Sequence, residues 1–228
     1  MLKNLVNKEE YFDGILKSLA NATDLFGDAE ILFKKKRYPR AYALFQYAIE
    51  EVGKASIIFN FILFEDVNDQ KKQKKFQKEF RNHEIKTQNA IGLDIMLAFA
   101  VPDKKNKSAL VYQVAEHEKN LKKINDLKNS SFYTDLKDDN FILPKEIITA
   151  KITADIQLVA KTRLNVAKSS LNMGMQHFDK LKEAAKRMDY QKMIDNPPDE
   201  MLELIKIKHG IEIKKKTPSS TPVRAAKK

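Results

Sequence analysis

The chain has 228 residues, with 42 Lys and Arg against 31 Asp and Glu, so its formal net charge is +11. It contains no cysteine, which excludes disulfide bonds, thiolate metal sites and cysteine nucleophiles. Only 6 Gly and 7 Pro are present, too few for the many turns of an all-β fold. We therefore expect an all-α protein, built as an antiparallel bundle of about five long helices.

Nothing in the sequence suits a membrane span. The longest nearly unbroken apolar run, residues 55–64, has ten residues, about half of what a transmembrane helix requires. The first twelve residues include Lys3, Lys8, Glu9 and Glu10 and lack the apolar core of a signal peptide. We expect a cytoplasmic protein without a membrane partner.

The positive charge is concentrated in three segments. Residues 204–228 contain eight Lys or Arg and one Glu, so we expect a helical domain over residues 1–210 and a basic, disordered tail over residues 211–228. Residues 71–86 contain seven Lys or Arg and two Glu, and residues 34–40 form another basic group. Such runs are usually solvated helix faces, but two of them beside one candidate site favour contact with RNA.

Apolar residues spaced three or four apart predict the helices. Long helices are expected over residues 8–36, 39–65, 71–101, 107–128 and 144–188, with a short one near 200–208. Pro39 separates the first two, because a residue before proline avoids the helical region and proline suits the first turn of the next helix. Residues 129–143 are expected to be irregular.

Two features predict a homodimer. The end of the second helix, residues 56–64, is apolar nearly all round and should be buried in a core or a subunit interface. A helix over 144–188 would be roughly 70 Å long at about 1.5 Å per residue, twice the thickness of a small domain. It should therefore either break, near Gly174, or pack on a second subunit.

Two short motifs carry the candidate site. The run Glu50-Glu51-Val52-Gly53-Lys54 lies in the second expected helix. Glycine in a helix costs roughly 1 kcal/mol relative to alanine, so Gly53 predicts a close contact with a neighbouring backbone. Glu51 lies on an alanine-lined face, where an unpaired carboxylate would be costly.

The other motif, Arg81-Asn82-His83-Glu84-Ile85-Lys86, lies in the third expected helix with His83 on its apolar stripe. With a turn near residue 67, Glu51 and His83 are each sixteen residues from it, so antiparallel helices would place them at one level. We predict one polar cluster of Glu51, Lys54, His83 and Lys86. It is either a satisfied buried set without chemistry or a catalytic site.

Several enzyme classes lack their motifs. None of the four histidines follows the Glu-x-x-His pattern of a ferritin-like di-iron site. His-Glu-x-x-His, a Walker loop and Gly-x-Gly-x-x-Gly are also missing from the sequence. We expect no metal and no cofactor.

Several runs of the sequence fit one known pattern: Asn21-Ala22, Asp28 to Leu32, Lys36 to Ala41, Ala48 to Ala55, and His83-Glu84-x-Lys86. They resemble the AbiV family of abortive infection proteins, bacterial antiphage factors of the HEPN superfamily. The resemblance extends over about residues 8–190 and leaves the basic tail uncovered. It implies a helical bundle, dimerisation, and a role in shutting down phage development at the host's expense.

Many HEPN relatives are metal-independent ribonucleases that use an Arg and a His separated by four to six residues, often with two subunits sharing the site. In this sequence Arg81 and His83 have one residue between them, and on a continuous helix they would point about 200° apart. If RNA is cleaved, the resemblance implies that His83 is the general acid or base. Lys86 would stabilise charge on the phosphate, and Glu51 would orient the imidazole.

Further cations complete the candidate set. Arg81 is the remaining arginine for catalysis, and Lys54, Lys78 and Arg163 are candidates for RNA binding, the last on a buried stripe of the final long helix.

Two functions stay open from the sequence. One is an antiphage effector that acts as a dimeric ribonuclease. The other is a non-catalytic helical protein that binds a phage-encoded protein or the translation machinery. A tetratricopeptide-like scaffold is disfavoured, because such arrays repeat near 34 residues and position 75 is Lys where Ala41 would recur.

Overall fold

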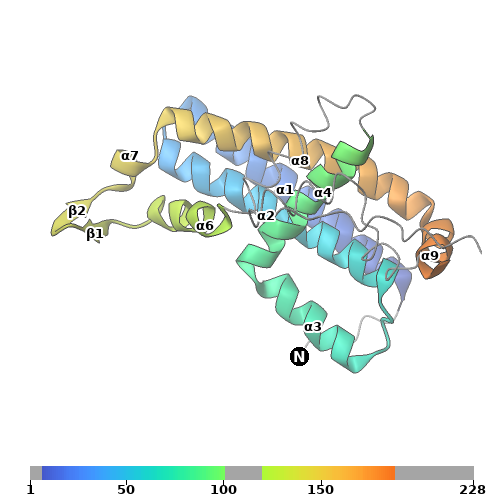
Figure 1. Cartoon of the computed structure of the whole chain (residues 1–228). Coiled ribbons are helices and arrows are strands. Elements are labelled where there is room, and N and C mark those ends of the chain that lie inside the picture. The colour runs from blue at the N-terminus through green and yellow to red at the C-terminus, as the bar shows by residue number, and fades with distance from the viewer. Residues whose placement is uncertain (1–6, 101–119, 188–228) are drawn as a thin grey trace, which may run out of the picture.

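The computed structural model describes residues 7–100 and 120–187 (Figure 1). The described fold is all-α, as predicted, with one small two-stranded hairpin. Its elements are α1 Lys8–Lys34, α2 Tyr38–Phe64, α3 Gln70–Arg81, α4 His83–Ala100, α6 Leu121–Ser130, β1 Asp135–Lys137, β2 Asn140–Ile142, α7 Pro144–Ile147, α8 Ala150–Gln176 and α9 Phe178–Arg187. In the described part, no helix is both long and apolar enough to cross a membrane.

α1 and α2 form a helical hairpin whose ends are set by local signals. Asn7 caps α1 by accepting a hydrogen bond from the backbone N–H of Glu10 at 2.9 Å. The connecting turn places Lys36 in the left-handed region, with a φ of 59°. α2 then begins with Pro39 in its first turn, as the sequence predicted.

α2 is the central helix of the bundle, with α1 and α8 alongside it and α4 crossing it (Figure 1). Most of its apolar end is buried within this chain, because Ile57, Ile58, Phe59, Phe61 and Ile62 are all at most 8% exposed, whereas the last residue, Phe64, is 48% exposed. Burying each such side chain stabilises the fold by about 1.5–3 kcal/mol. Of the two places expected for this segment, the structure therefore shows the core, and this segment does not require a second subunit.

The predicted continuous helix over 71–101 is wrong. Asn82 has an extended conformation (φ −83°, ψ 121°) and separates α3 from α4. Its side chain accepts a hydrogen bond from the N–H of Ile85 at 3.0 Å, which caps α4. α3 has no buried residue and contacts the bundle through Phe76, which stacks on Phe61 with ring centroids 4.5 Å apart. The helix that packs across α2 is therefore α4.

Residues 129–143, which were expected to be irregular, contain a β-hairpin. β1 and β2 are antiparallel, with Leu136 opposite Phe141. The turn residues Asp138 and Asp139 have φ values of 51° and 60°, the backbone that a tight hairpin requires. Strands of three residues are too short to show an alternation of apolar and polar residues in the sequence.

The helix expected over residues 107–128 is described only at its end, as α6. The start of that expected helix lies outside the described residues.

The expected helix over 144–188 is broken twice, into α7, α8 and α9. Thr149 caps α8 by accepting from the N–H of Ile152 at 3.3 Å, and the second break falls at His177, close to the break expected near Gly174. The length of this segment therefore gives no reason for a second subunit. The short helix near 200–208 and the basic tail lie outside the described residues.

Candidate functional site

Glu50, in the middle of α2, is the centre of the site. It is only 2% exposed. Its Oε1 accepts from Nζ of Lys128 at 2.6 Å, and its Oε2 lies 2.6 Å from Nδ1 of His83 and 3.1 Å from Nζ of Lys86. One buried carboxylate thus joins α2 to α4 and α6. We call these four residues the Glu50 cluster.

The cluster holds Glu50 in its ionised form. Burial alone would raise the pKa of its carboxyl group, but hydrogen bonds from Lys128 and His83 and the charges of Lys128 and Lys86 outweigh it. The net effect lowers the pKa of Glu50 below its ordinary value of 4.5. Two ammonium groups face one carboxylate, so the cluster carries a positive charge even when His83 is neutral.

Exposure changes sharply across the cluster. Lys86 and Lys128 are 5% and 3% exposed, whereas the side chain of His83 is 54% exposed. Since Nδ1 of His83 contacts Glu50, Nε2 is the ring nitrogen left to exchange a proton with a bound molecule. The arrangement is a half-exposed imidazole on a buried, charged support.

Gly53 sets the distance between α2 and α4. A Cβ atom at this position would lie 1.8 Å from the backbone oxygen of Lys86, so only glycine lets the first turn of α4 lie against α2. The close backbone contact expected from the sequence is confirmed. A further link holds α4 in place, because the amide of Gln46 donates to the hydroxyl of Thr87 at 3.2 Å.

The predicted contact between Glu51 and His83 is wrong by one residue, since the carboxylate at His83 is that of Glu50. One residue is a rotation of about 100° on a helix. Glu51 instead pairs with Lys54 along α2, and the Lys54 ammonium lies 5.5 Å from the centre of the Phe80 ring. The expected single cluster is therefore two sets: His83 and Lys86 meet, whereas Glu51 and Lys54 form a separate pair.

Sequence reasoning missed Glu50 and Lys128. Glu50 was inside the recognised motif, but level matching along a continuous third helix selected its neighbour. Lys128 is 78 residues away from Glu50 along the chain, and no local sequence pattern predicts such a distant contact.

The other candidate residues lie in different environments. Lys78 and Arg81 are both exposed on α3, three residues apart and hence on one face. Because Asn82 breaks the helix between Arg81 and His83, the 200° separation expected for a continuous helix does not apply. Arg163 is 2% exposed in α8 and has an interaction of its own, so its side chain is too buried to contact RNA directly.

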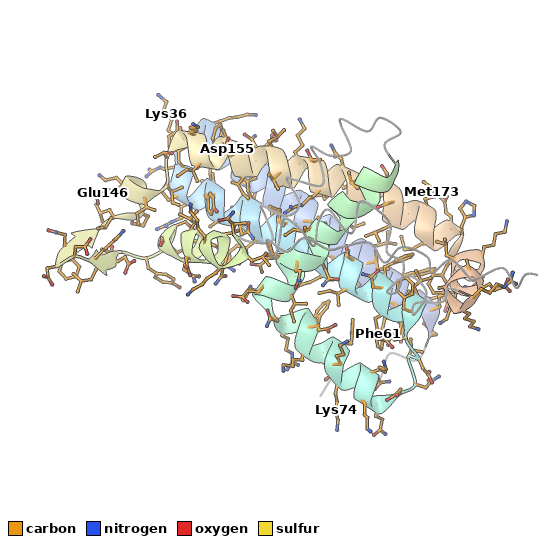
Figure 2. All side chains as sticks on the ribbon, viewed as in Figure 1. Lys36, Phe61, Lys74, Glu146, Asp155 and Met173 are labelled. Carbon is orange, nitrogen blue, oxygen red and sulfur yellow. The ribbon has the colours of Figure 1, made fainter. Side chains whose placement is uncertain are left out.

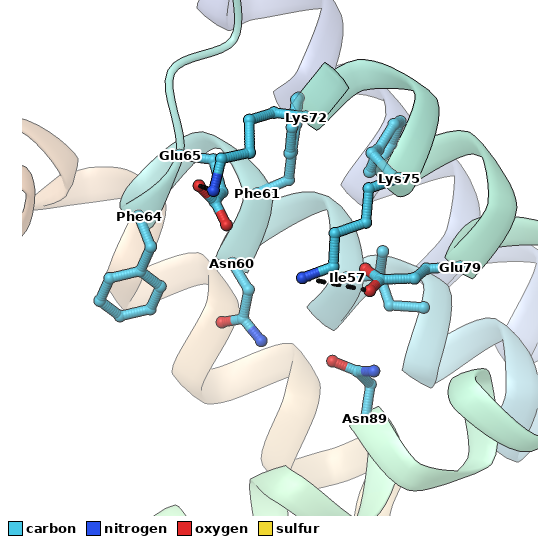
Figure 3. Close-up of a pocket in the computed structure, with 10 residues that line it drawn as sticks. Ile57, Asn60, Phe61, Phe64, Glu65, Lys72, Lys75, Glu79 and Asn89 are labelled. Carbon is cyan, nitrogen blue, oxygen red and sulfur yellow. Dashed lines mark ion pairs between the residues drawn. The ribbon is translucent and has the colours of Figure 1, made fainter. Parts of the chain in front are cut away.

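A cavity of about 140 Å³ lies among α2, α3 and α4 (Figure 3). Its lysines are matched by acids: Lys72 is 2.8 Å from Glu65, and Lys75 is 3.7 Å from Glu79. It therefore has no unbalanced charge with which to attract an anion. Among the described residues, no three His, Asp or Glu side chains gather as ligands for a metal ion.

Comparison with protein-family models identifies a family for this chain. The family model of AbiV, a HEPN family, matches residues 10–165 of the chain, more than half of its length. The matched range contains every member of the Glu50 cluster. Neither a search of curated proteins nor a search of solved structures found a match.

Proposed function

Because this chain belongs to the AbiV family of HEPN domains, which implies a function in abortive infection, we propose that it is an effector that cleaves RNA at the Glu50 cluster. The observation that carries the proposal is the half-exposed imidazole of His83, held at Nδ1 by a buried carboxylate 2.6 Å away. A histidine fixed in this way is suited to general acid–base catalysis.

The proposed reaction uses only the RNA and side chains. A base takes the proton of a 2′-hydroxyl, and the 2′-oxygen forms a bond to the adjacent phosphorus. The bond from phosphorus to the 5′-oxygen breaks, and the leaving oxygen takes up a proton. The products are a 2′,3′-cyclic phosphate and a 5′-hydroxyl. Nε2 of His83 performs one of the two proton transfers.

The remaining residues have different proposed roles. Glu50 orients the ring, while Lys86 and Lys128 keep Glu50 ionised. Both lysines are too buried to contact a phosphate directly, so Lys86 is a positioning residue rather than the phosphate ligand expected from the sequence. Arg81 and Lys78 are exposed next to His83 along the chain and are the proposed phosphate contacts.

A cleavage assay tests the proposal. Purified full-length protein is incubated with RNA in EDTA, and the products are analysed for cyclic phosphate ends. We expect wild type to cut and His83→Gln to be inactive with an unchanged circular dichroism spectrum. His177→Gln is the matched control, because His177 is also exposed but lies at the far end of α8. Equal cutting by wild type and His83→Gln would refute the role of His83.

Failure of the wild type to cut RNA would favour the other function. The protein would then be a non-catalytic interaction protein in abortive infection, binding a phage-encoded protein or the translation machinery. The Glu50 cluster would serve only to hold α2, α4 and α6 together, and growth arrest would follow stability rather than the presence of His83.

We also propose that the effector is a cytoplasmic homodimer. The support is the family resemblance together with two large apolar side chains on α8, Leu158 and Met173, which are 68% and 58% exposed. Met173 lies on the outer side of α8 (Figure 2).

A further inference from the structure

A basic cavity of about 400 Å³ lies where α1 joins α2, beside the start of α7. Its lining residues are Lys36, Arg37, Pro39, Arg40, Leu143, Pro144 and Lys145. Four of these seven side chains are cationic, and no acid is among the described residues that line the cavity. In contrast to the lysines of the 140 Å³ cavity, these cations are not balanced by carboxylates in the wall.

The cations of this cavity are exposed rather than used in the core. Lys36, Arg37 and Lys145 are all exposed, and Lys36 extends outward from the end of the bundle (Figure 2). Lys36 has a φ of 59°, a conformation that favours glycine and costs a side-chain-bearing residue roughly 1 kcal/mol. Backbone geometry alone would therefore favour glycine at this position. The exposed lysine side chain is placed where it can contact a ligand.

A row of side chains connects the cavity to the Glu50 cluster. The guanidinium of Arg40 donates to the backbone oxygen of Ser131 and lies 5.2 Å from the centre of the Phe132 ring. Phe132 is 6.2 Å from the Tyr47 ring, and Nζ of Lys128 lies 5.3 Å from that same ring. Lys128 belongs to the Glu50 cluster.

Tyr133 adds an exposed aromatic ring to this row. It follows Phe132 directly, their ring centroids are 6.4 Å apart, and it is 71% exposed. An exposed ring beside cations is the combination that binds unpaired bases, because every base has a face that can stack.

The dimensions suit one bound strand. Arg40 and Glu50 are ten residues apart on α2, which is about 15 Å at the rise of an α-helix. A few nucleotides of a single strand span that length.

We propose that the cavity binds backbone phosphates of a single-stranded RNA, that an unpaired base of this strand stacks on Tyr133, and that the strand continues to His83. The last step rests on the proposed function, whereas binding in the cavity does not. Positive charge supplies affinity without sequence preference, and stacking restricts the ligand to unpaired nucleotides.

Fluorescence anisotropy tests the cavity. The probe is a labelled single-stranded oligoribonucleotide of about 12 nucleotides, bound to full-length His83→Gln protein so that it is not cut. Adding Arg37→Glu and Lys145→Glu should weaken binding at least about tenfold and lower the slope of log affinity against log salt by about two. Lys161→Glu with Lys180→Glu, exposed on α8 and α9, makes the same change in net charge and should have much less effect.

Tyr133 is tested by a pair of substitutions in the same assay. Tyr133→Ala should weaken binding at least about fivefold, whereas Tyr133→Phe, which keeps a stacking ring, should bind as the parent does. An equal loss in both would show that stacking is not the contribution of this residue.

The outcomes separate the cavity from the nuclease. Equal binding by the cavity variant and its charge-matched control would overturn the cavity as an RNA site. A cleavage rate at low RNA concentration that stays at the wild-type value with Arg37→Glu and Lys145→Glu would overturn the continuation of the bound strand to His83. The binding assay could show a loss only in the cavity variant while the wild type fails to cut RNA in the cleavage assay. That result would support RNA binding in the cavity and refute the proposed nuclease activity. No binding of the probe by any form would overturn the cavity as an RNA site.

Discussion

At the scale of single residues, Glu50 and Glu51 show how far neighbouring carboxylates can differ. Glu50 is in contact with two ammonium groups and an imidazole, and its side chain is 3% exposed. Glu51 is paired with Lys54, and its side chain is 14% exposed. Removing one partner from a buried charge set leaves an uncompensated charge, which costs about 3–5 kcal/mol. The pair of Glu51 and Lys54 keeps more contact with solvent, so its loss should cost less.

We therefore predict that Glu50→Gln lowers the free energy of unfolding at neutral pH by about 3–5 kcal/mol. Glu51→Gln, the matched control, should lower it by less, because Glu51 is more exposed and has one cationic partner, Lys54. Urea denaturation followed by circular dichroism measures both. A larger loss for Glu51→Gln than for Glu50→Gln would contradict the assignment of Glu50 as the central residue.

The stability that Glu50 contributes should depend on pH. Its pKa in the folded protein is below the ordinary value of 4.5, so its contribution is fully present above the unfolded pKa and is lost as pH falls through the folded pKa. The difference in unfolding free energy between wild type and Glu50→Gln should therefore be large at pH 7 and shrink below about pH 4.5. If the difference in unfolding free energy grew on acidification, the pKa of Glu50 in the folded protein would not be lowered.

At the scale of helices, two glycines in helix interiors differ in the space around them. A Cβ on Gly53 would meet the backbone oxygen of Lys86 at 1.8 Å, whereas a Cβ on Gly27 would meet nothing within 4 Å. Backbone cannot give way as a flexible side chain can, so a methyl group on Gly53 must push α4 away from α2.

Gly53→Ala should lower the free energy of unfolding by about 1–3 kcal/mol and also reduce RNA cleavage, because α4 carries His83. Gly27→Ala should instead raise stability by about 0.5–1 kcal/mol and leave cleavage unchanged. Thermal denaturation and the cleavage assay measure the two effects together. A Gly53→Ala protein with full stability and activity would show that the two helices are not held by this contact.

Local signals in the sequence predicted some of these features and misled on others. Pro39 and Gly53 act through their own backbone geometry, so the start of α2 and the close helix contact were predictable. The apolar spacing of Phe76, Phe80 and His83 continues through Asn82, so periodicity hid the break, although Asn82 is itself a good capping residue. Level matching assumed a continuous helix and gave Glu51 in place of Glu50 as the partner of His83. The contact of Lys128 depends on packing that no local pattern encodes.

At the scale of the whole molecule, the structure changes the reasons for expecting a dimer. Most of the apolar end of α2 is buried in this chain, with Phe64 as its exposed last residue, and the last helix is broken into shorter ones, so neither feature requires a partner. The exposed apolar side chains of α8 are a different reason, because Leu158 and Met173 are 68% and 58% exposed.

We predict that the protein sediments as a dimer of 26.3 kDa chains at micromolar concentration. Leu158→Glu with Met173→Glu should yield a folded monomer, because buried carboxylates at an interface would lack partners. Lys161→Glu, an exposed change on the same helix, is the control. A wild type that is monomeric, or a dimer unaffected by the double substitution, would refute this interface.

We propose that the imidazole of His83 takes part in RNA cleavage rather than holding the fold. Chemical rescue tests it most directly, since the half-exposed ring of His83 would leave an open space beside Glu50 in His83→Ala. We predict that His83→Ala protein does not cut RNA in EDTA, and that free imidazole restores cleavage with cyclic phosphate products. Two results would contradict this role. One is a folded His83→Ala protein that stays inactive with free imidazole although the wild type cuts RNA. The other is a wild type that leaves RNA intact.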